Sequence, residues 1–101
     1  IKLAFGKHAY EIAASATKSL IGHPQGAAGA AGAVATVLAL RDAFIHPTIN
    51  YENPDPECDL DYVPNLGRAG ELDVVMCNTI AFGSKNSALV LKHPESEGAA
   101  A

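Results

Sequence analysis

The chain has 101 residues and a formal net charge of −4; 49% of its residues are apolar and 6% are aromatic. This length allows one domain at most, and an acidic balance with scattered lysines argues against a nucleic-acid surface. We expect neither a membrane span nor a signal peptide, because no long apolar run is free of breakers and no basic segment precedes one. Alanine supplies much of the apolar fraction, and the chain contains nine glycines besides. Because alanine buries little area, we expect the chain to pack within something larger.

The first quarter of the chain predicts three short elements. Residues 1–7 are typical of a helix end that stops at Gly6, which implies further sequence upstream. Residues 10–16 are apolar with polar interruptions and predict a strand. Residues 17–25 contain Gly and Pro and predict a loop.

A glycine- and alanine-rich helix follows, beginning at Gly26 and running for about 18 residues. Gly26, Gly29 and Gly32 recur at every third position, and each costs about 1 kcal/mol relative to alanine inside a helix. A close approach of another backbone, from a second helix or a sheet, would offset that cost. Polar residues are nearly absent before Arg41, so we expect this helix to be buried on all sides.

The second half of the chain predicts a loop and a hairpin. Residues 50–64 combine prolines with acidic residues, which is typical of an extended surface loop. Residues 72–82 predict a buried strand, 83–86 a turn, and 87–92 a second strand that completes the hairpin. Residues 94–101 are expected to be a disordered tail or an expression remnant.

The two cysteines, Cys58 and Cys77, have a spacing that fits no zinc or redox motif. Two free thiols are the expectation, and a disulfide between them stays an alternative. Because no other metal-ligand pattern is present, we expect no metal site.

Two residues before the glycine helix could carry chemistry. His23 is expected within the first turn of that helix, where the positive end of the helix dipole favours a neutral imidazole. A neutral imidazole can donate one N–H to a developing oxyanion, and Lys18 nearby would add positive potential. Their spacing alone is weak, so a surface lysine and a loop histidine form the alternative. The Phe82–Gly83 turn could offer a backbone N–H to an oxyanion, although most such turns are only turns.

Three stretches together resemble one family. Residues 15–30 closely resemble the Lys-Ser-x-x-Gly-His-x-x-Gly-Ala-Ala-Gly segment of the β-ketoacyl-acyl carrier protein synthases. Residues 47–64 match that family's next signature, and residues 78–86 are similar to its closing Asn-Ser-Phe-Gly-Phe-Gly-Gly-Thr-Asn motif. The similarity covers nearly the whole chain, and the chain resembles the elongating, type II condensing enzymes of fatty acid synthesis.

The resemblance implies an α/β fold. Residues 1–93 would be the C-terminal portion of a thiolase-like ketosynthase domain, with a mixed sheet packed on the buried Gly/Ala-rich helix. The implied activity is decarboxylative Claisen condensation of an acyl chain with malonyl-acyl carrier protein. No cofactor is implied beyond the phosphopantetheine arm of acyl carrier protein. The implied partners are that carrier protein, the missing N-terminal portion and a second copy in a homodimer, in the cytoplasm.

The resemblance also implies roles for single residues. His23 would donate a hydrogen bond to the malonyl thioester carbonyl, Lys18 would organise the site electrostatically, and Phe82 would gate the acyl pocket and supply an oxyanion-hole N–H. The residues expected to support the pocket or the turn are Gly22, Ile80, Ala81, Gly83 and Asn86.

The sequence also departs from the family. The nucleophilic cysteine and the other catalytic histidine are expected upstream, because neither Cys58 nor Cys77 occupies the position of the nucleophile. The closing motif differs at five positions, Thr79, Ile80, Ala81, Ser84 and Lys85. Glycine at position 81 or 84 would permit unusual backbone angles that these residues disfavour. The alternatives are therefore a polyketide-type ketosynthase, a non-catalytic subunit similar to a chain-length factor, or a truncated remnant.

Overall fold

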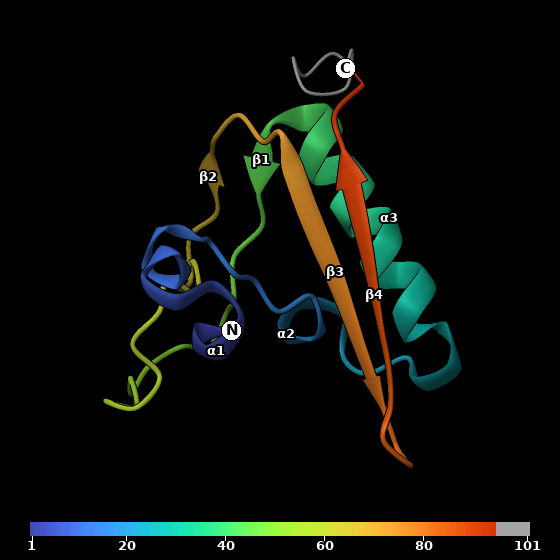
Figure 1. The fold of residues 1–101 in the computed structure, drawn as a ribbon, viewed down its shortest axis with the longest axis horizontal. Coiled ribbons are helices and arrows are strands. Elements are labelled where there is room, and N and C mark those ends of the chain that lie inside the picture. Colours follow the sequence, from blue (N-terminus) through green and yellow to red (C-terminus); the bar gives the residue numbers. More distant parts are fainter. Residues whose placement is uncertain (95–101) are drawn as a thin grey trace. The chain divides into compact units, whose positions relative to one another are not determined.

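The computed structural model describes residues 1–94 and divides the chain into two compact units (Figure 1). Unit 1 contains Ile1–Gly22 and Ile45–Arg68, and unit 2 contains His23–Phe44 and the chain from Ala69 onward. Two short strands, β1 (Phe44–Ile45) and β2 (Arg68–Ala69), pair with each other. No helix in the described part is long and apolar enough to cross a membrane.

Unit 1 begins with two short helical turns, α1 (Lys2–Phe5) and the 3₁₀ helix η1 (Gly6–Glu11). The predicted helix end at Gly6 is confirmed: Gly6 caps α1 with φ 57°, and its N–H bonds to the Lys2 carbonyl. This positive φ is a conformation that glycine adopts at little cost.

The predicted strand at residues 10–16 is wrong. Its first two residues belong to η1, and the rest forms one isolated parallel bridge, Ala13 with Asp61. The segment lacks a continuous strand partner because its backbone groups bond at scattered points. The Ala14 N–H donates to the Asp61 carbonyl at 2.8 Å, and the Ala16 N–H donates to the Thr48 hydroxyl at 3.0 Å.

The predicted loop at residues 17–25 is wrong in its centre, where helix α2 (Lys18–Ile21) forms. Gly22 ends this single turn with φ 77°, and its N–H donates to the Lys18 carbonyl at 2.9 Å. A four-residue helix is too short to show an apolar period in the sequence, so propensity alone could not reveal it.

The predicted loop at residues 50–64 is confirmed, since it contains only the bridge residues Asp61 and Pro64. Two hydrogen bonds between Tyr51 and Asn65 close the loop. The Tyr51 backbone N–H donates to the Asn65 side-chain oxygen at 3.0 Å, and the Asn65 side-chain nitrogen donates to the Tyr51 carbonyl at 2.8 Å. Val63 is 1% exposed, so the end of this surface loop reaches the small core of unit 1.

Unit 2 consists of the 3₁₀ turn η2 (Gln25–Ala27), helix α3 (Ala28–Asp42) and an antiparallel hairpin of β3 (Val74–Ala81) and β4 (Lys85–Lys92). The predicted helix and hairpin are confirmed. The α-helix begins two residues later than predicted, after η2. The second strand begins two residues earlier, because the turn between the strands occupies only residues 82–84.

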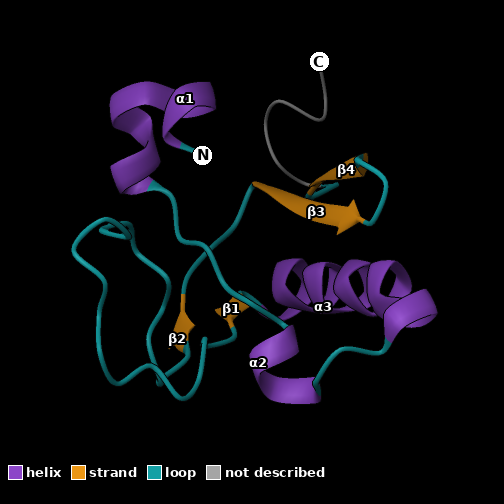
Figure 2. Cartoon of the chain, turned by 90° about the horizontal axis from the view of Figure 1, so that it is seen from below, coloured by secondary structure: helices purple, strands orange, loops and turns teal. Residues whose placement is uncertain are grey.

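Helix α3 packs on β3 through two of the three glycines (Figure 2). A methyl group added to Gly32 would lie 2.8 Å from the Cys77 sulfur, and one added to Gly29 would lie 3.7 Å from the Thr79 hydroxyl. A close contact between the helix and a strand is thus confirmed at Gly32, although the atom that Gly32 meets belongs to a side chain and not to the backbone, and Gly29 is in ordinary contact. The prediction is wrong for Gly26, which precedes α3 and has no atom within 4 Å of an added methyl.

Within residues 1–94, helix α3 packs on the hairpin and is otherwise open, so its expected burial on all sides depends on a larger protein and stays a prediction. None of the residues of α3 is buried, and Val34 and Val37 are 58% and 51% exposed. In β3, exposure alternates along the strand: Cys77 is half-buried on the helix side, whereas Met76 and Ile80 are exposed. The predicted buried strand is therefore covered on one face only.

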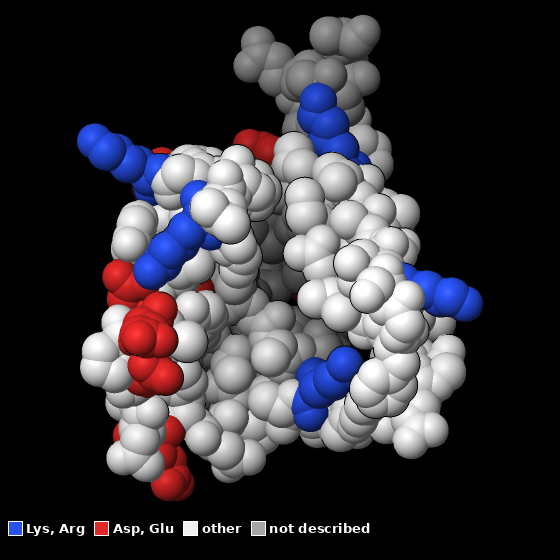
Figure 3. All heavy atoms as spheres, turned by 60° about the horizontal axis from the view of Figure 1, so that its bottom comes forward, with Lys and Arg blue, Asp and Glu red and all other residues white. Residues whose placement is uncertain are grey.

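Charge is distributed unevenly over the surface. In Figure 3, most of the visible acidic side chains gather in one region, whereas large parts of the face shown carry no charge. Five of the acidic residues lie in the 52–61 stretch of the surface loop, Glu52, Asp55, Glu57, Asp59 and Asp61. Two of them form ion pairs, Asp59 with Lys2 and Asp61 with Arg68.

Candidate functional site

His23 is exposed and lies before both helical elements of unit 2. The expectation that it sits within the first turn of the glycine helix is therefore wrong: η2 begins at Gln25 and α3 at Ala28. Two residues delay the helix. Pro24 precedes it in a non-helical conformation, and Gln25 adopts a left-handed φ of 50°.

The His23 ring forms one hydrogen bond within the described residues. Its Nδ1 accepts the Gln25 backbone N–H at 3.2 Å. A backbone N–H can only donate, so Nδ1 must present its lone pair, and a neutral ring then carries its proton on Nε2. The Nε2–H has no partner in this part of the chain, and it can donate to a ligand. The local fold thereby selects one tautomer of His23.

Lys18 and Gly22 lie in unit 1. Lys18 is the first residue of α2 and is exposed, and its carbonyl accepts the Gly22 N–H that closes this turn. The Lys18 ammonium has no ion-pair partner among residues 1–94, so its charge is not neutralised by a carboxylate there. An unpaired exposed cation creates positive potential in its own surroundings.

Phe82 begins the tip of the hairpin, and its side chain is fully exposed. Gly83 follows with φ 80° and Ser84 with φ 61°, and Ala81 pairs with Lys85 to close the turn. The family's closing motif has glycine at position 84, where this chain has serine. Ser84 adopts a left-handed conformation, which costs a non-glycine residue roughly 1–2 kcal/mol.

The remaining predicted support residues lie on the hairpin. Ile80 and Asn86 face each other as a cross-strand pair, on the face opposite to the half-buried Cys77 and Thr79. Within residues 1–94, no hydrogen bond links His23 to Phe82, Ile80 or Asn86.

Both cysteines are free thiols, as predicted. Cys58 is exposed in the acidic loop, and Cys77 is half-buried with its sulfur against Gly32. Among the described residues, no three His, Cys, Asp or Glu side chains gather as they would to hold a metal ion.

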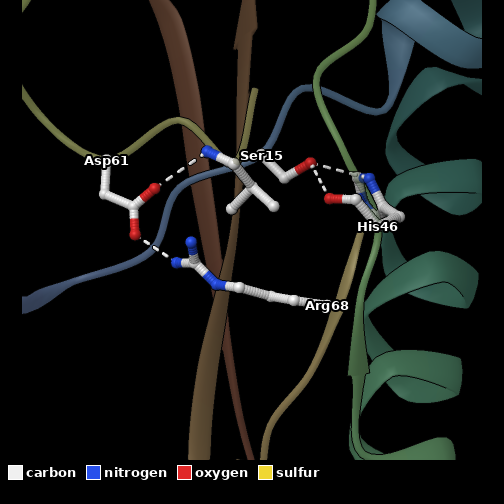
Figure 4. A network of polar contacts seen from close by, with 5 residues as sticks. Ser15, His46, Asp61 and Arg68 are labelled. Atoms are coloured by element: carbon white, nitrogen blue, oxygen red, sulfur yellow. Dashed lines mark hydrogen bonds and ion pairs between the residues drawn. The ribbon is translucent and has the colours of Figure 1, made fainter. Parts of the chain in front are cut away.

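Sequence reasoning missed a polar cluster in unit 1, formed by Ser15, Thr17 and His46 and called here the His46 cluster. The Ser15 hydroxyl lies 2.6 Å from the His46 carbonyl oxygen and 2.7 Å from His46 Nδ1 (Figure 4). The Thr17 hydroxyl lies 3.4 Å from His46 Nε2. These partners are 29 and 31 positions apart in the chain, so no local pattern could reveal them.

A second polar group in unit 1, also drawn in Figure 4, centres on Asp61. Its carboxylate forms an ion pair with Arg68 and accepts the Val63 backbone N–H at 3.0 Å. The Arg68 guanidinium lowers the pKa of Asp61 most, burial opposes that effect, and the Val63 N–H lowers the pKa further. The charged carboxylate thereby fixes the end of the loop beside the 13–14 segment.

The family described as "Beta-ketoacyl synthase, C-terminal domain" matches residues 1–52, slightly more than half of the chain. The chain belongs to the β-ketoacyl synthase family. It is 56% identical to the 3-oxoacyl-(acyl-carrier-protein) synthase 2 of Coxiella burnetii over 90% of its own length and 22% of that protein. It is 50% identical to a putative polyketide β-ketoacyl synthase 1 of Streptomyces halstedii over 94% of its length and 22% of that protein.

A solved structure supports the same assignment. This synthase chain is similar to a type II polyketide ketosynthase solved in complex with its acyl-carrier protein, with a TM-score of 0.87 and 37% identity over 90% of this chain and 22% of that one. The predicted α/β, thiolase-like fold is thus confirmed. The chain spans about a fifth of the length of the relatives it matches.

Proposed function

We propose that this chain is the C-terminal part of a condensing enzyme that elongates acyl chains with malonyl units carried on acyl carrier protein. One observation carries the proposal: the Gln25 N–H holds the His23 imidazole as the tautomer whose free Nε2–H is a donor. An exposed donor of this kind is what a developing thioester enolate requires.

The reaction has two steps, decarboxylation and condensation. Loss of CO₂ from the malonyl group leaves its electron pair on an enolate, and His23 Nε2–H donates a hydrogen bond to the enolate oxygen. The enolate carbon then attacks an acyl thioester, and the enzyme cysteine departs as a thiolate. The Phe82 backbone N–H would stabilise the oxyanion formed at that acyl carbonyl, and the Lys18 ammonium would favour negative charge in the site.

The nucleophilic cysteine is proposed to lie in a part of the enzyme outside this chain. The 22% coverage of the relatives supports this, since a complete synthase would be several times longer. The packing of Cys77 against Gly32 supports it as well. We further propose that the enzyme is a cytoplasmic homodimer whose partner is acyl carrier protein; the similar ketosynthase was solved in complex with such a carrier.

Fatty acid elongation is the proposed pathway. The relatives that are 56% and 54% identical are both 3-oxoacyl-(acyl-carrier-protein) synthases 2, from Coxiella burnetii and a Synechocystis strain. A polyketide ketosynthase is the second candidate, because a relative of that kind is 50% identical. Ile80 and Ala81 at the end of β3 are the residues on which the acyl preference would depend.

A non-catalytic subunit similar to a chain-length factor is the third candidate. The chain is 45% identical to a structure described as a ketosynthase/chain length factor, with a TM-score of 0.75 over 77% of this chain. The free His23 Nε2–H and the unpaired Lys18 favour the catalytic alternative, since a non-catalytic subunit has no use for either. A cysteine nucleophile upstream in the intact protein would decide between the two.

The test replaces His23 with alanine in the intact protein and follows condensation of acyl and malonyl thioesters. Loss of a preorganised oxyanion donor predicts a fall in kcat of about 100-fold or more. The matched control is His8→Ala, because His8 is an exposed histidine whose hydrogen bond is to the Glu11 side chain. Equal activity of the two variants would remove His23 from the mechanism.

A further inference from the structure

We infer that His46 is a positioning residue for Lys18: its imidazole fixes the backbone segment that carries this lysine, through Ser15 and Thr17. The inference rests on the proposed function, because His46 acts on the reaction only through Lys18. All four residues belong to unit 1. The side chains of Ser15, Thr17 and His46 are partly buried, whereas Lys18 is exposed.

The contacts of His46 Nδ1 assign its proton. The Ser15 hydroxyl lies 2.6 Å from the His46 carbonyl oxygen, which can only accept, so the single Ser15 proton is committed there. Nδ1, at 2.7 Å from the same hydroxyl, must then donate to the Ser15 oxygen. The Pro47 carbonyl, 3.4 Å from Nδ1, is also only an acceptor and agrees with this assignment.

The other ring nitrogen follows from the first. In a neutral imidazole with its proton on Nδ1, Nε2 presents a lone pair. The Thr17 hydroxyl, 3.4 Å away, is then the donor to Nε2. The His46 ring thereby bonds to the side chains of both Ser15 and Thr17, and Thr17 directly precedes Lys18.

Further bonds limit how this segment can move. The Ala16 N–H donates to the Thr48 hydroxyl at 3.0 Å, and the Ser19 hydroxyl accepts the Ile49 N–H at 3.1 Å. Lys18 thus lies between anchored neighbours on both sides. Among residues 1–94, the Thr17 side chain has a hydrogen-bond partner only in His46, so the restraint on Lys18 depends on His46 at this position.

The experiment is a double-mutant cycle in the intact protein. His46→Asn keeps a donor near the Nδ1 position and the backbone carbonyl but loses the Nε2 acceptor, and Thr17→Val removes the same bond from the other side. Each is measured with Lys18 present and with Lys18→Ala, as kcat/KM for condensation. The thermal midpoint of every variant is recorded, so that loss of folding is separated from loss of activity.

With Lys18 present, we expect each variant to lower kcat/KM by about fivefold, the effect of one hydrogen bond between neutral groups. In the Lys18→Ala background the same variants should change it little, because the group they position is gone. Thr17→Ser, which keeps the hydroxyl, should recover most of what Thr17→Val loses. His8→Asn is the control for an exposed histidine of the same unit.

Two results would overturn the inference. Equal losses in both backgrounds would mean that His46 acts independently of Lys18, and no loss with Lys18 present would mean that it positions nothing. These outcomes leave the proposed function intact. If Lys18→Ala alone had full activity, the role of Lys18 in the proposed function would fail, and the inference about His46 with it.

Discussion

At the scale of single residues, the chain shows how backbone groups select the state of a side chain. The Gln25 N–H determines which nitrogen of His23 is the donor. The His46 carbonyl accepts the Ser15 proton and thereby makes Nδ1 the donor nitrogen of the His46 ring. Neither bond could be read from the sequence. The motif predicted that His23 is important, but its tautomer depends on the left-handed turn at Gln25.

Asp61 gives a prediction for pH dependence. Its pKa is lowered in the folded protein, chiefly by Arg68, so its charge stabilises the fold at pH values above the unfolded pKa of about 3.9. That stabilisation is lost as the pH falls through the lower, folded pKa. Asp61→Asn should therefore lower the thermal midpoint of the intact protein near pH 7, and the difference from wild type should shrink as the pH falls below about 4.

A matched variant, Glu71→Gln, removes an exposed carboxylate that has no ion pair among residues 1–94. It should leave the midpoint nearly unchanged across the same pH range. A difference between Asp61→Asn and wild type that stayed constant down to pH 3 would show that the carboxylate's charge is not what stabilises this loop.

At the scale of elements, helix α3 and the hairpin were predictable because each is a long local pattern. The glycine spacing predicted a close approach, and Gly32 provides it against Cys77. The strand predicted at 10–16 failed for the opposite reason: its composition favours a strand, but only Asp61 offers it a bridge. Helix α2 was missed because a single turn between Thr17 and Gly22 is too short to show an apolar period in the sequence.

The glycines of α3 give a second prediction, to be measured as the free energy of unfolding of the intact protein. Gly29→Ala should stabilise it by up to about 1 kcal/mol, since alanine favours the helix and the new methyl meets Thr79 at an ordinary distance. Gly32→Ala should be destabilising, because its methyl would lie 2.8 Å from the Cys77 sulfur.

Cys77→Ala supplies the control for that clash. In a Cys77→Ala background the sulfur is gone, so Gly32→Ala should recover the helix-propensity gain and behave as Gly29→Ala does. If Gly32→Ala were equally harmful in both backgrounds, the contact with Cys77 would not be the reason for this glycine.

At the scale of the whole molecule, about half of the residues are apolar, yet very few of the described residues are buried. Among the described residues only Ala9 and Val63 are buried, while most of the large apolar side chains of α3 and the hairpin are exposed. The sequence predicted this need for additional protein from its alanine and glycine content. It could not predict which faces would lack cover, because that depends on the packing of α3 against one side of β3.

The chain expressed by itself should therefore be poorly soluble or molten. We expect far-UV circular dichroism with helix and strand signal, weak near-UV signal and no sharp thermal transition. A cooperative transition from a monomer with native-like near-UV signal would contradict the conclusion that this chain needs the rest of the enzyme to fold.

Release of CO₂ from the malonyl group is the step in which His23 is proposed to act, and it can be measured by itself. The intact protein, already acylated, is given malonyl-acyl carrier protein, and CO₂ and the acyl-enzyme are both followed for wild type and His23→Ala. The account predicts that the variant acquires the acyl group normally but releases CO₂ at least about 100-fold more slowly. Wild-type CO₂ release by the variant would contradict it.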